Sequence, residues 1–482
     1  MDRPRFMVMT YPAQGQINPS LQFAKRLATV GADVTFVLPL SAYSRMSKCS
    51  EPVTQNGSAM SFAPFSIDGY DDGFKRGGDM NHYRSEMRRC GSQTITDLVV
   101  SGQNDGRPYC CFVYTLLLTW AGSAAAELGI PSVLLWIQPA TVFDVYYFFF
   151  NGYADIIKET MSKRQSPTKT TLPGLSLEFG RRELPSFMDV EDAYSFFLPQ
   201  FEEQFEMVSK QNHQRSVLVN TFDELEAEAL RAVSDLNLIG IGPLIPSAFS
   251  DENDPSDKSF GGDIFRGSED NKGTSIFQWL NSKPKTTVVY VSFGSILDLS
   301  KQQMEEIAKG LLSFGRTFLW VIREKSEKVE NHKDCDDDND ELVSCREELE
   351  KLGMIVPWCS QMEVLSNESI GCFVTHCGWN STLESLASGV PMVAFPRWSD
   401  QGTNAKLIEE EWKIGVRVKP NEDEIVDSEE IRRCLELVMG KENEEMRRNG
   451  KKWKELAKGA VKEGGSSDKN LKSFVAEMNN YI

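Results

Sequence analysis

Short apolar runs alternate with amphipathic stretches along most of the chain, and this alternation restricts the possible folds more than any other feature. The pattern opens with an apolar run at residues 6–10, apolar positions at helical spacing over 21–30, and a second run at 34–38. This is the pattern of a βαβ unit. Further apolar runs, each near a helical stretch, lie at residues 111–114, 132–136, 216–220 and 238–241. Such alternation predicts a parallel, doubly wound sheet.

A second alternation follows a polar segment rich in Gly, Asp and Ser at residues 247–273, which has the composition of a linker. The strands expected beyond it are 286–293, 318–322, 354–356 and 372–375, with a helix at 302–313. A chain of 482 residues exceeds what one hydrophobic core usually supports. We therefore predict an α/β protein with two Rossmann-like domains, at residues 1–246 and 274–460.

The overall charge argues against two classes of partner. A formal net charge of −18 disfavours binding to nucleic acid or to an anionic membrane surface. The N-terminus lacks the pattern of a signal peptide. The longest apolar region, residues 133–150, is interrupted by Gln138, Pro139 and Asp144, so we interpret it as buried core rather than a membrane span. These features predict a cytoplasmic protein without membrane insertion.

Two features bear on metal binding. The ten cysteines include no CxxC pair, which disfavours a zinc site and fits a reducing compartment. The acidic run at residues 324–345 lacks the glycine and the final glutamate of a calcium-binding EF-hand loop, so a surface loop is the better interpretation. We predict no metal site.

The most informative segment begins where the strand expected at 372–375 meets a glycine-bearing turn and a helix. Open α/β sheets bind ligands at this kind of junction. Ser381 and Glu384 fit a capping box, which predicts a helix that starts near Ser381. Free N–H groups and the positive end of the helix dipole at this start suit a diphosphate, although helix capping alone also explains the two residues.

Other residues of this segment allow two interpretations each. Trp358 after Pro357 is either a packed aromatic residue or a surface on which a nucleobase stacks. Asp400 and Gln401 form either an ordinary polar turn or a set of partners for sugar hydroxyls. His376 is either a structural residue or a donor to phosphate, and no partner set at ligand spacing favours a metal ligand.

Taken together, residues 358–401 resemble the 44-residue signature box of plant secondary-product UDP-glycosyltransferases. Residues 12–15, 291–295 and 466–470 extend the resemblance over the full chain. Residues 113–118 and 135–140 are most similar to the branch that holds anthocyanin 5-O-glucosyltransferases and glucosyl-ester-forming enzymes. The resemblance implies a GT-B fold with two Rossmann-like domains facing across a cleft. It also implies that residues 461–482 form a helix that packs back on the first domain.

The resemblance further implies a role for each domain. The N-terminal domain binds the acceptor and the C-terminal domain binds the UDP-sugar. The implied UDP-sugar-binding residues are Ser295, Trp358, Cys359, Gln361, His376, Gly378, Trp379, Asn380, Ser381, Glu384, Asp400 and Gln401. In this assignment Trp358 stacks on uracil and Glu384 holds the ribose, while His376 donates to the diphosphate and Asp400 and Gln401 bind the sugar. The candidate acceptor residues are Leu117, Ile137, Gln138, Phe143 and Arg397, which core packing explains equally well.

The implied reaction is an inverting transfer of glucose from UDP-glucose, the co-substrate, to a hydroxyl or carboxyl group of a small hydrophobic plant metabolite. Similar enzymes carry a basic histidine where this chain has Gln16, and an orienting aspartate where it has Thr115. An amide is not a general base near neutral pH. Two interpretations therefore stay open, an impaired glucosyltransferase and a catalytically silent UDP-sugar-binding protein. A dehydrogenase is disfavoured because no G-x-G-x-x-G follows the first strand. We expect a monomer without cofactor.

Overall fold

The computed structural model divides the chain into two compact units, which we describe separately. Unit 1 comprises Met1–Glu269 and Leu456–Ile482, and unit 2 comprises Asp270–Glu455. The residues described within them are 3–49, 59–75, 77–162, 169–189, 192, 195–210, 215–250, 254–257, 272–294, 299–323, 344–440 and 443–480.

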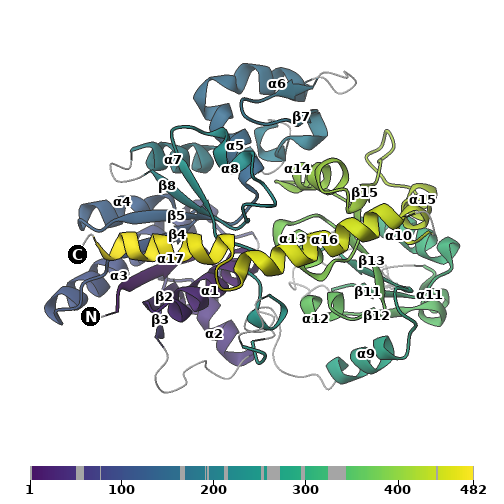
Figure 1. The fold of residues 1–482 in the computed structure, drawn as a ribbon, viewed down its shortest axis with the longest axis horizontal. Helices are drawn as coiled ribbons and strands as arrows, with labels where there is room; N and C mark the ends of the chain where they lie inside the picture. Colours follow the sequence, from purple (N-terminus) through teal and green to yellow (C-terminus); the bar gives the residue numbers. More distant parts are fainter. Residues whose placement is uncertain are drawn as a thin grey trace. The chain divides into compact units, whose positions relative to one another are not determined.

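Unit 1 is built on a parallel seven-stranded sheet of order β3-β2-β1-β4-β5-β8-β9 (Figure 1). In register, Phe6 lies between Val34 and Cys111. Parallel strands covered on both faces are nearly continuous apolar runs, which is why the sequence pattern located most of them. The strands are β1 Arg5–Met9, β2 Asp33–Pro39, β3 Met60–Phe65, β4 Cys111–Thr115, β5 Ser132–Trp136, β8 Ser216–Val219 and β9 Asn237–Gly240. A small antiparallel pair, β6 Thr170–Thr171 and β7 Glu178–Phe179, lies outside this sheet.

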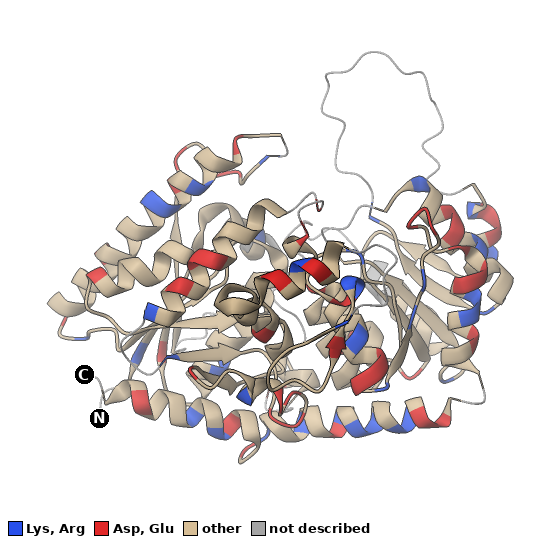
Figure 2. Ribbon diagram, turned by 90° about the horizontal axis from the view of Figure 1, so that it is seen from above, with Lys and Arg blue, Asp and Glu red and all other residues tan. Residues whose placement is uncertain are grey.

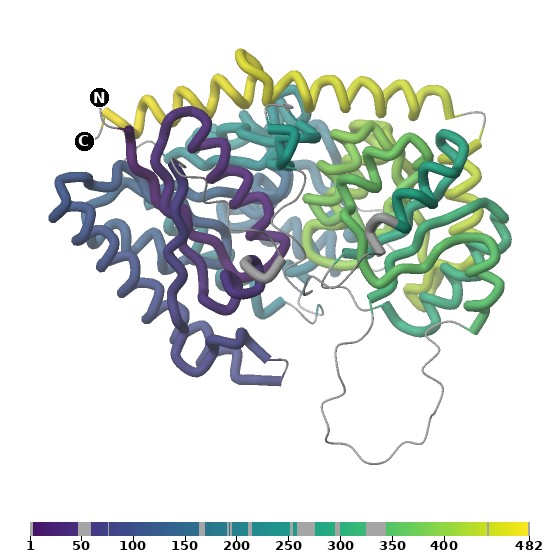
Figure 3. Tube along the Cα trace, turned by 90° about the horizontal axis from the view of Figure 1, so that it is seen from below, coloured from purple at the N-terminus to yellow at the C-terminus, as the bar shows by residue number. Residues whose placement is uncertain are grey.

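Helices connect the strands of unit 1, and the last helix of the chain also belongs to it. Figure 3 shows this helix, α17, beside the purple N-terminal strand, and the rings of Phe6 and Phe474 lie 5.9 Å apart. The helices are α1 Gln14–Thr29, α2 Leu40–Cys49, α3 Met80–Asn104, α4 Thr119–Glu127, α5 Ala140–Phe148, α6 Ala154–Ser162, α7 Leu198–Lys210, α8 Ala229–Ala232 and α17 Ser466–Asn479.

Unit 2 contains a parallel six-stranded sheet of order β12-β11-β10-β13-β14-β15. Its strands are β10 Val288–Ser292, β11 Phe318–Val321, β12 Met354–Val356, β13 Ile370–Thr375, β14 Met392–Ala394 and β15 Gly415–Arg417. Its helices are α9 Lys272–Asn281, α10 Lys301–Phe314, α11 Arg346–Leu352, α12 Gln361–Leu365, α13 Trp379–Ser388, α14 Gln401–Lys406 and α15 Ser428–Met439, and α16 Glu444–Val461 runs on into unit 1. Figure 2 shows acidic and basic residues interspersed on the helices of each unit.

Both sheets have a topological switch point, where the chain changes the direction in which it adds strands. In unit 1 the point lies between β1 and β4, and in unit 2 it lies between β10 and β13. Loops that leave neighbouring strands in opposite directions open a crevice at the carboxyl ends, and ligands bind there in doubly wound sheets. The loops after these four strands are therefore where a site is expected.

The strands expected at 6–10, 34–38, 111–114, 132–136 and 354–356 are confirmed to within about one residue, and the core assignment of 133–150 is confirmed by the burial of β5 and α5. The helix expected at 21–30 is corrected, because α1 begins at Gln14 and includes Pro19. Strands β3, β14 and β15 were not predicted. Within the described residues no helix is both long and apolar enough to cross a membrane. Most of the expected linker and residues 324–343 of the acidic run lie outside the described residues.

Candidate functional site

The helix after β13 starts two residues earlier than the sequence predicted. Helix α13 begins at Trp379 with Gly378 as its N-cap, and no side chain caps it. Ser381 is therefore in the first turn, and Glu384 is in the second. The capping-box interpretation was wrong, because the backbone at Gly378 sets the start and leaves both side chains for other partners. The first turn of α13 follows the carboxyl end of β13, at the switch point.

The ring of His376 fits closely between two glycines. A Cβ at Gly378 would lie 2.5 Å from its Nε2, and one at Gly294, where φ is +75°, would lie 2.7 Å from it. Both positions thus need glycine to admit the imidazole. Nδ1 is buried without a partner among the described residues, and burial lowers the pKa of His376 to about 4. The imidazole is neutral at pH 7 and keeps one nitrogen for a ligand.

Two residues other than glycine adopt a left-handed backbone at the ends of neighbouring strands. Cys377 has φ of 64° and Ser399 has φ of 61°. Such conformations cost about 1 to 3 kcal/mol each and persist where surrounding contacts hold them. At Cys377 these contacts are the bond from its N–H to Thr375 Oγ1 at 3.2 Å and that from Asn404 Nδ2 to its carbonyl at 2.8 Å.

The side-chain amide of Gln361 on α12 connects two other predicted residues, Ser381 and Glu384 on α13. Gln361 Nε2 donates to Ser381 Oγ at 2.9 Å and to Glu384 Oε2 at 2.6 Å, while Tyr290 donates to Gln361 Oε1 at 3.3 Å. Glu384 is only 4% exposed, and burial raises its pKa to about 7 although the bond from Gln361 lowers it. A buried carboxyl poised near neutrality is typical of functional sites.

The segment just before α12 carries two more predicted residues. Cys359 is buried, with its Sγ 3.5 Å from the hydroxyl of Tyr290, and Trp358 before it is partly exposed. Tyr290 on β10 thus connects Cys359 with Gln361. The sequence analysis missed Tyr290 because it lies within a continuous apolar run.

The predicted sugar-binding pair lies at the start of α14. Gln401 Oε1 accepts from the backbone N–H groups of Arg397 at 2.9 Å and Trp398 at 3.2 Å. Asp400 Oδ2 accepts from Asn404 Nδ2 at 2.7 Å, and the same nitrogen reaches the Cys377 carbonyl. Asn404 therefore ties the loop after β14 to the loop after β13. It too was missed, although its position one turn after Asp400 was a usable signal.

Three further residues were predicted to bind the UDP-sugar, and the structure describes two of them, Trp379 and Asn380. Trp379 is 4% exposed and packs against Trp412, with ring centroids 5.9 Å apart. Asn380 is partly exposed in the first turn of α13. Ser295 lies outside the described residues, so no contact is assigned to it.

The switch point of unit 1 brings together the positions of the expected base and its partner. Thr115 Oγ1 donates to Gln16 Oε1 at 2.7 Å and accepts from the N–H of Tyr11 at 3.2 Å. Gln16 is 7% exposed and Thr115 is fully buried. Because its oxygen is occupied, the free end of the Gln16 amide is an N–H donor. This arrangement binds acceptors of hydrogen bonds and does not remove protons.

The candidate acceptor residues divide between the two units. Leu117, Ile137, Gln138 and Phe143 belong to unit 1, and Arg397 belongs to unit 2. Leu117 has a left-handed backbone with φ of 69°, and Gln138 Oε1 is buried without a partner in the described part of the chain. Phe143 is fully buried, 5.2 Å from the ring of Trp136. Its ring is therefore core, whereas the orphaned Gln138 oxygen suits a ligand.

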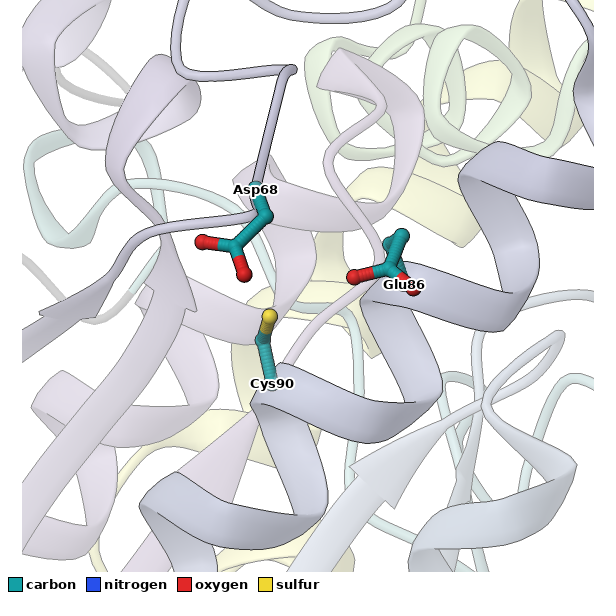
Figure 4. A group of neighbouring side chains, drawn as sticks. All are labelled: Asp68, Glu86 and Cys90. Atoms are coloured by element: carbon teal, nitrogen blue, oxygen red, sulfur yellow. The ribbon is translucent and has the colours of Figure 1, made fainter.

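One group of side chains has the composition of a metal site. Ligand atoms of Asp68, Glu86 and Cys90 lie within 4.8 Å of one another, and Figure 4 shows the Cys90 sulfur near the Asp68 carboxylate. Arg89 forms hydrogen bonds with both carboxylates, at 2.8 Å to Glu86 Oε2. A guanidinium ion already neutralises this pair, so the group carries no metal assignment.

Comparison with known proteins identifies the family. The model of the family described as UDP-glucoronosyl and UDP-glucosyl transferase matches residues 198–450. Phloretin 4'-O-glucosyltransferase from Malus domestica is 59% identical over 484 residues, which cover 99% of this chain and 98% of that protein. The chain belongs to the UDP-glycosyltransferase family.

Other members of this UDP-glycosyltransferase family agree with the branch and the fold. Anthocyanidin 3-O-glucoside 5-O-glucosyltransferase 1 from Perilla frutescens is 48% identical over 487 residues, 99% of each chain. A crystal structure of Os79 from O. sativa in complex with UDP matches with a TM-score of 0.79 and 32% identity, over 98% of this chain and 100% of that one. The predicted family and GT-B fold are confirmed.

Proposed function

We propose that this protein transfers glucose from UDP-glucose to a small hydrophobic plant metabolite. Unit 2 binds the donor and unit 1 binds the acceptor. The observation that carries the proposal is the buried network of Gln361, Ser381 and Glu384 beside His376, at the carboxyl ends of the unit 2 strands. Nδ1 of His376 is buried without a partner among the described residues, and a diphosphate, a ribose and a sugar offer polar groups that complement these side chains.

Each part of the donor has a chemical counterpart in the proposed site. Trp358 stacks on uracil, and the backbone of Cys359 pairs with the same base. Glu384 accepts hydrogen bonds from the ribose hydroxyls. The neutral His376 and the first-turn amides of α13 donate to the diphosphate, as a helix N-terminus does for anions generally. Asp400 and Gln401 bind the sugar hydroxyls beside Trp379. Gly378, Asn380 and Ser295 complete the phosphate-binding segment.

The proposed reaction is an inverting displacement at the anomeric carbon. The acceptor oxygen forms the new bond as the bond to UDP breaks, and the amides of α13 and His376 stabilise the charge on departing UDP. A hydroxyl acceptor must also lose its proton, which Gln16 does not remove. A carboxylate acceptor is already ionised near neutral pH, with a pKa of about 4, and needs no base. Impaired transfer to hydroxyls is therefore part of the proposal.

The alternative is a UDP-sugar-binding protein without transferase activity, favoured by Gln16 alone. The proposed sugar-binding pair argues against this alternative, because Asn404 holds Asp400 and the backbone N–H groups of Arg397 and Trp398 hold Gln401. A protein that had stopped transferring glucose would have little need of these residues. Transfer of glucose to any acceptor by the unmodified chain decides between the two.

Gln16→His tests the assignment of the base. The variant is expected to raise turnover on a phenol by roughly 10² to 10⁴-fold, the usual contribution of a general base. On a carboxylic acid the gain is expected to be smaller, because no proton needs to be removed. Both rates are measured with UDP-glucose by product chromatography.

Gln16→Ala is the matched control, since it removes the amide without supplying a base and should give no gain. Equal rates of phenol glucosylation by the unmodified chain and Gln16→His would refute the base assignment.

We also propose that the protein is a cytoplasmic monomer that works without a metal. Full activity after dialysis against a chelator is the expected result.

A further inference from the structure

Aromatic rings form a continuous row from the core of unit 1 to its surface. Phe201 stacks on Tyr146 with centroids 4.5 Å apart, and Phe187 lies 6.0 Å from Phe201 and 5.5 Å from Phe197. Phe196 lies 4.5 Å from Phe197 and is 49% exposed. An exposed aromatic ring that continues such a row offers a flat apolar surface for a ligand.

The guanidinium group of Arg84 covers the outer end of this row. It lies 5.3 Å from the ring centroid of Phe197 and 5.7 Å from that of Phe196. With the Gln200 amide assigned by its hydrogen bonds, Gln200 Oε1 accepts from Arg84 Nη1 at 2.7 Å and from Nη2 at 3.2 Å. The two phenylalanine rings and the Gln200 amide thus fix the orientation of the Arg84 side chain.

Arg84 differs from Arg89 on the same helix in its electrostatic partners. Arg89 pairs with the carboxylates of Glu86 and Asp68. Among the described residues no carboxylate lies within ion-pair distance of Arg84, and Gln200 is neutral. A guanidinium has five N–H donors, so this partly buried cation keeps donors for a further acceptor.

The charge of Arg84 acts on Tyr11, in the loop just before helix α1, which carries Gln16. Burial raises the pKa of Tyr11, and the positive charge of Arg84 counteracts that rise. The N–H of Tyr11 in turn donates to Thr115, which donates to Gln16. Arg84, near the start of α3, therefore belongs to the same carboxyl edge of the unit 1 sheet as Gln16.

We propose that Arg84 is a specificity-determining residue that binds a carboxylate on the acceptor, whose aromatic part lies against Phe196 and Phe197. A guanidinium fixed in this way matches the two oxygens of a carboxylate. The inference rests on the proposed function, since it names the class of acceptor that unit 1 takes.

The test compares 4-hydroxycinnamate with 4-hydroxycinnamamide, which keeps the phenol and the shape but lacks the charge. With UDP present, the protein is expected to bind the acid at least 10-fold more tightly than the amide in calorimetry. Arg84→Met keeps an apolar contact on the rings and should weaken acid binding by roughly 10 to 100-fold, as for a lost hydrogen bond to a charged group, with little effect on the amide. Arg84→Lys should retain part of the preference.

Arg88→Met is the matched control, because Arg88 is exposed on the same helix and should leave both affinities unchanged. Equal affinity for acid and amide, no binding of either, or an equal loss on both with Arg84→Met would overturn the proposal. UDP binding by the Arg84→Met variant is measured in parallel. Failure of the donor site would abolish UDP binding in every variant, whereas failure of this inference would leave it intact.

Discussion

At the scale of single residues, the most consequential group is the buried carboxyl of Glu384. Burial raises its pKa from 4.5 to about 7, which corresponds to a cost of about 3 kcal/mol for ionising it in the free protein. Since the folded pKa is raised, the stability that the protonated group provides is lost as pH rises from 4.5 through 7. In the proposed donor complex, a ribose hydroxyl that donates to the ionised carboxylate would offset this cost.

The affinity for UDP-glucose should consequently depend on pH. Below pH 7 binding must remove a proton from Glu384, so the Kd is expected to rise by up to about tenfold per pH unit between 7 and 5.5. UDP-glucose is the suitable probe because its diphosphate lacks the ionisation near pH 6 of a terminal phosphate. Glu384→Gln should bind more weakly at pH 8 and show a nearly flat profile. Parallel profiles for the two proteins, measured by calorimetry, would contradict this role.

At the scale of elements, two buried acids lie near the start of α5. Glu226 caps the helix, whereas Asp144 is buried at an unfavourable cost if it is ionised. Glu226 accepts from the N–H groups of Ala140 and Thr141, both at 3.0 Å, and so caps the helix. Asp144, one turn later, is fully buried, and neither of its oxygens has a partner within the described residues. Burial, and then the charge of Glu226, raise the pKa of Asp144 well above its usual range.

Asp144→Asn should therefore change how the free energy of unfolding depends on pH. A raised folded pKa means that the native state holds a proton which the unfolded state releases, so stability falls as pH rises above about 4, by up to about 1.4 kcal/mol per unit. The Asn variant lacks this fall in stability. In urea titrations its free energy of unfolding should therefore rise relative to that of the unmodified protein between pH 5 and 7. Glu226→Ala should instead destabilise the protein by about 3 kcal/mol, because it leaves the buried N–H groups of Ala140 and Thr141 unpaired. If the free energy of unfolding of Asp144→Asn depended on pH as that of the unmodified protein does, Asp144 would not be protonated in the native state.

At the scale of the whole molecule, the chain returns to unit 1 after completing unit 2. Helix α17 is fixed there by a bond from Ser467 Oγ to the Gly242 carbonyl at 2.6 Å and by bonds from Asn470 Nδ2 to Gly240 O at 2.9 Å and Asp223 Oδ1 at 3.1 Å. Phe474, 2% exposed, packs against Phe6. Helix α17 thus packs on strand β1 and stabilises unit 1.

Phe474→Ala should destabilise unit 1 without weakening donor binding in unit 2. The expected loss is about 3 to 5 kcal/mol, as for other large-to-small changes in a packed core. Thermal unfolding should report a lower Tm, while calorimetry at low temperature should give an unchanged Kd for UDP. Lys472→Ala, on the exposed face of α17, serves as the control. A large loss of UDP affinity in Phe474→Ala would mean that the two units are not independent in this respect.

The sequence determined the parallel sheets and the family box, because apolar runs and glycine-bearing turns are local properties of a chain. Strand β5, for example, was predicted at its observed limits of 132–136. Local patterns did not locate the start of α13, since a capping box at Ser381 is as regular in sequence as the observed start at Trp379.

Only the tertiary structure decided which partner each polar group meets. Glu384 meets Gln361 from a different helix, Asn404 reaches the carbonyl of Cys377, and Arg84 finds an amide in place of a carboxylate. Hydrogen bonds and ion pairs act over a few ångströms, whereas the residues that make them are separated by many positions in the chain. Burial, which sets the pKa of Glu384, His376 and Asp144, is likewise a property of the packed fold and not of any segment.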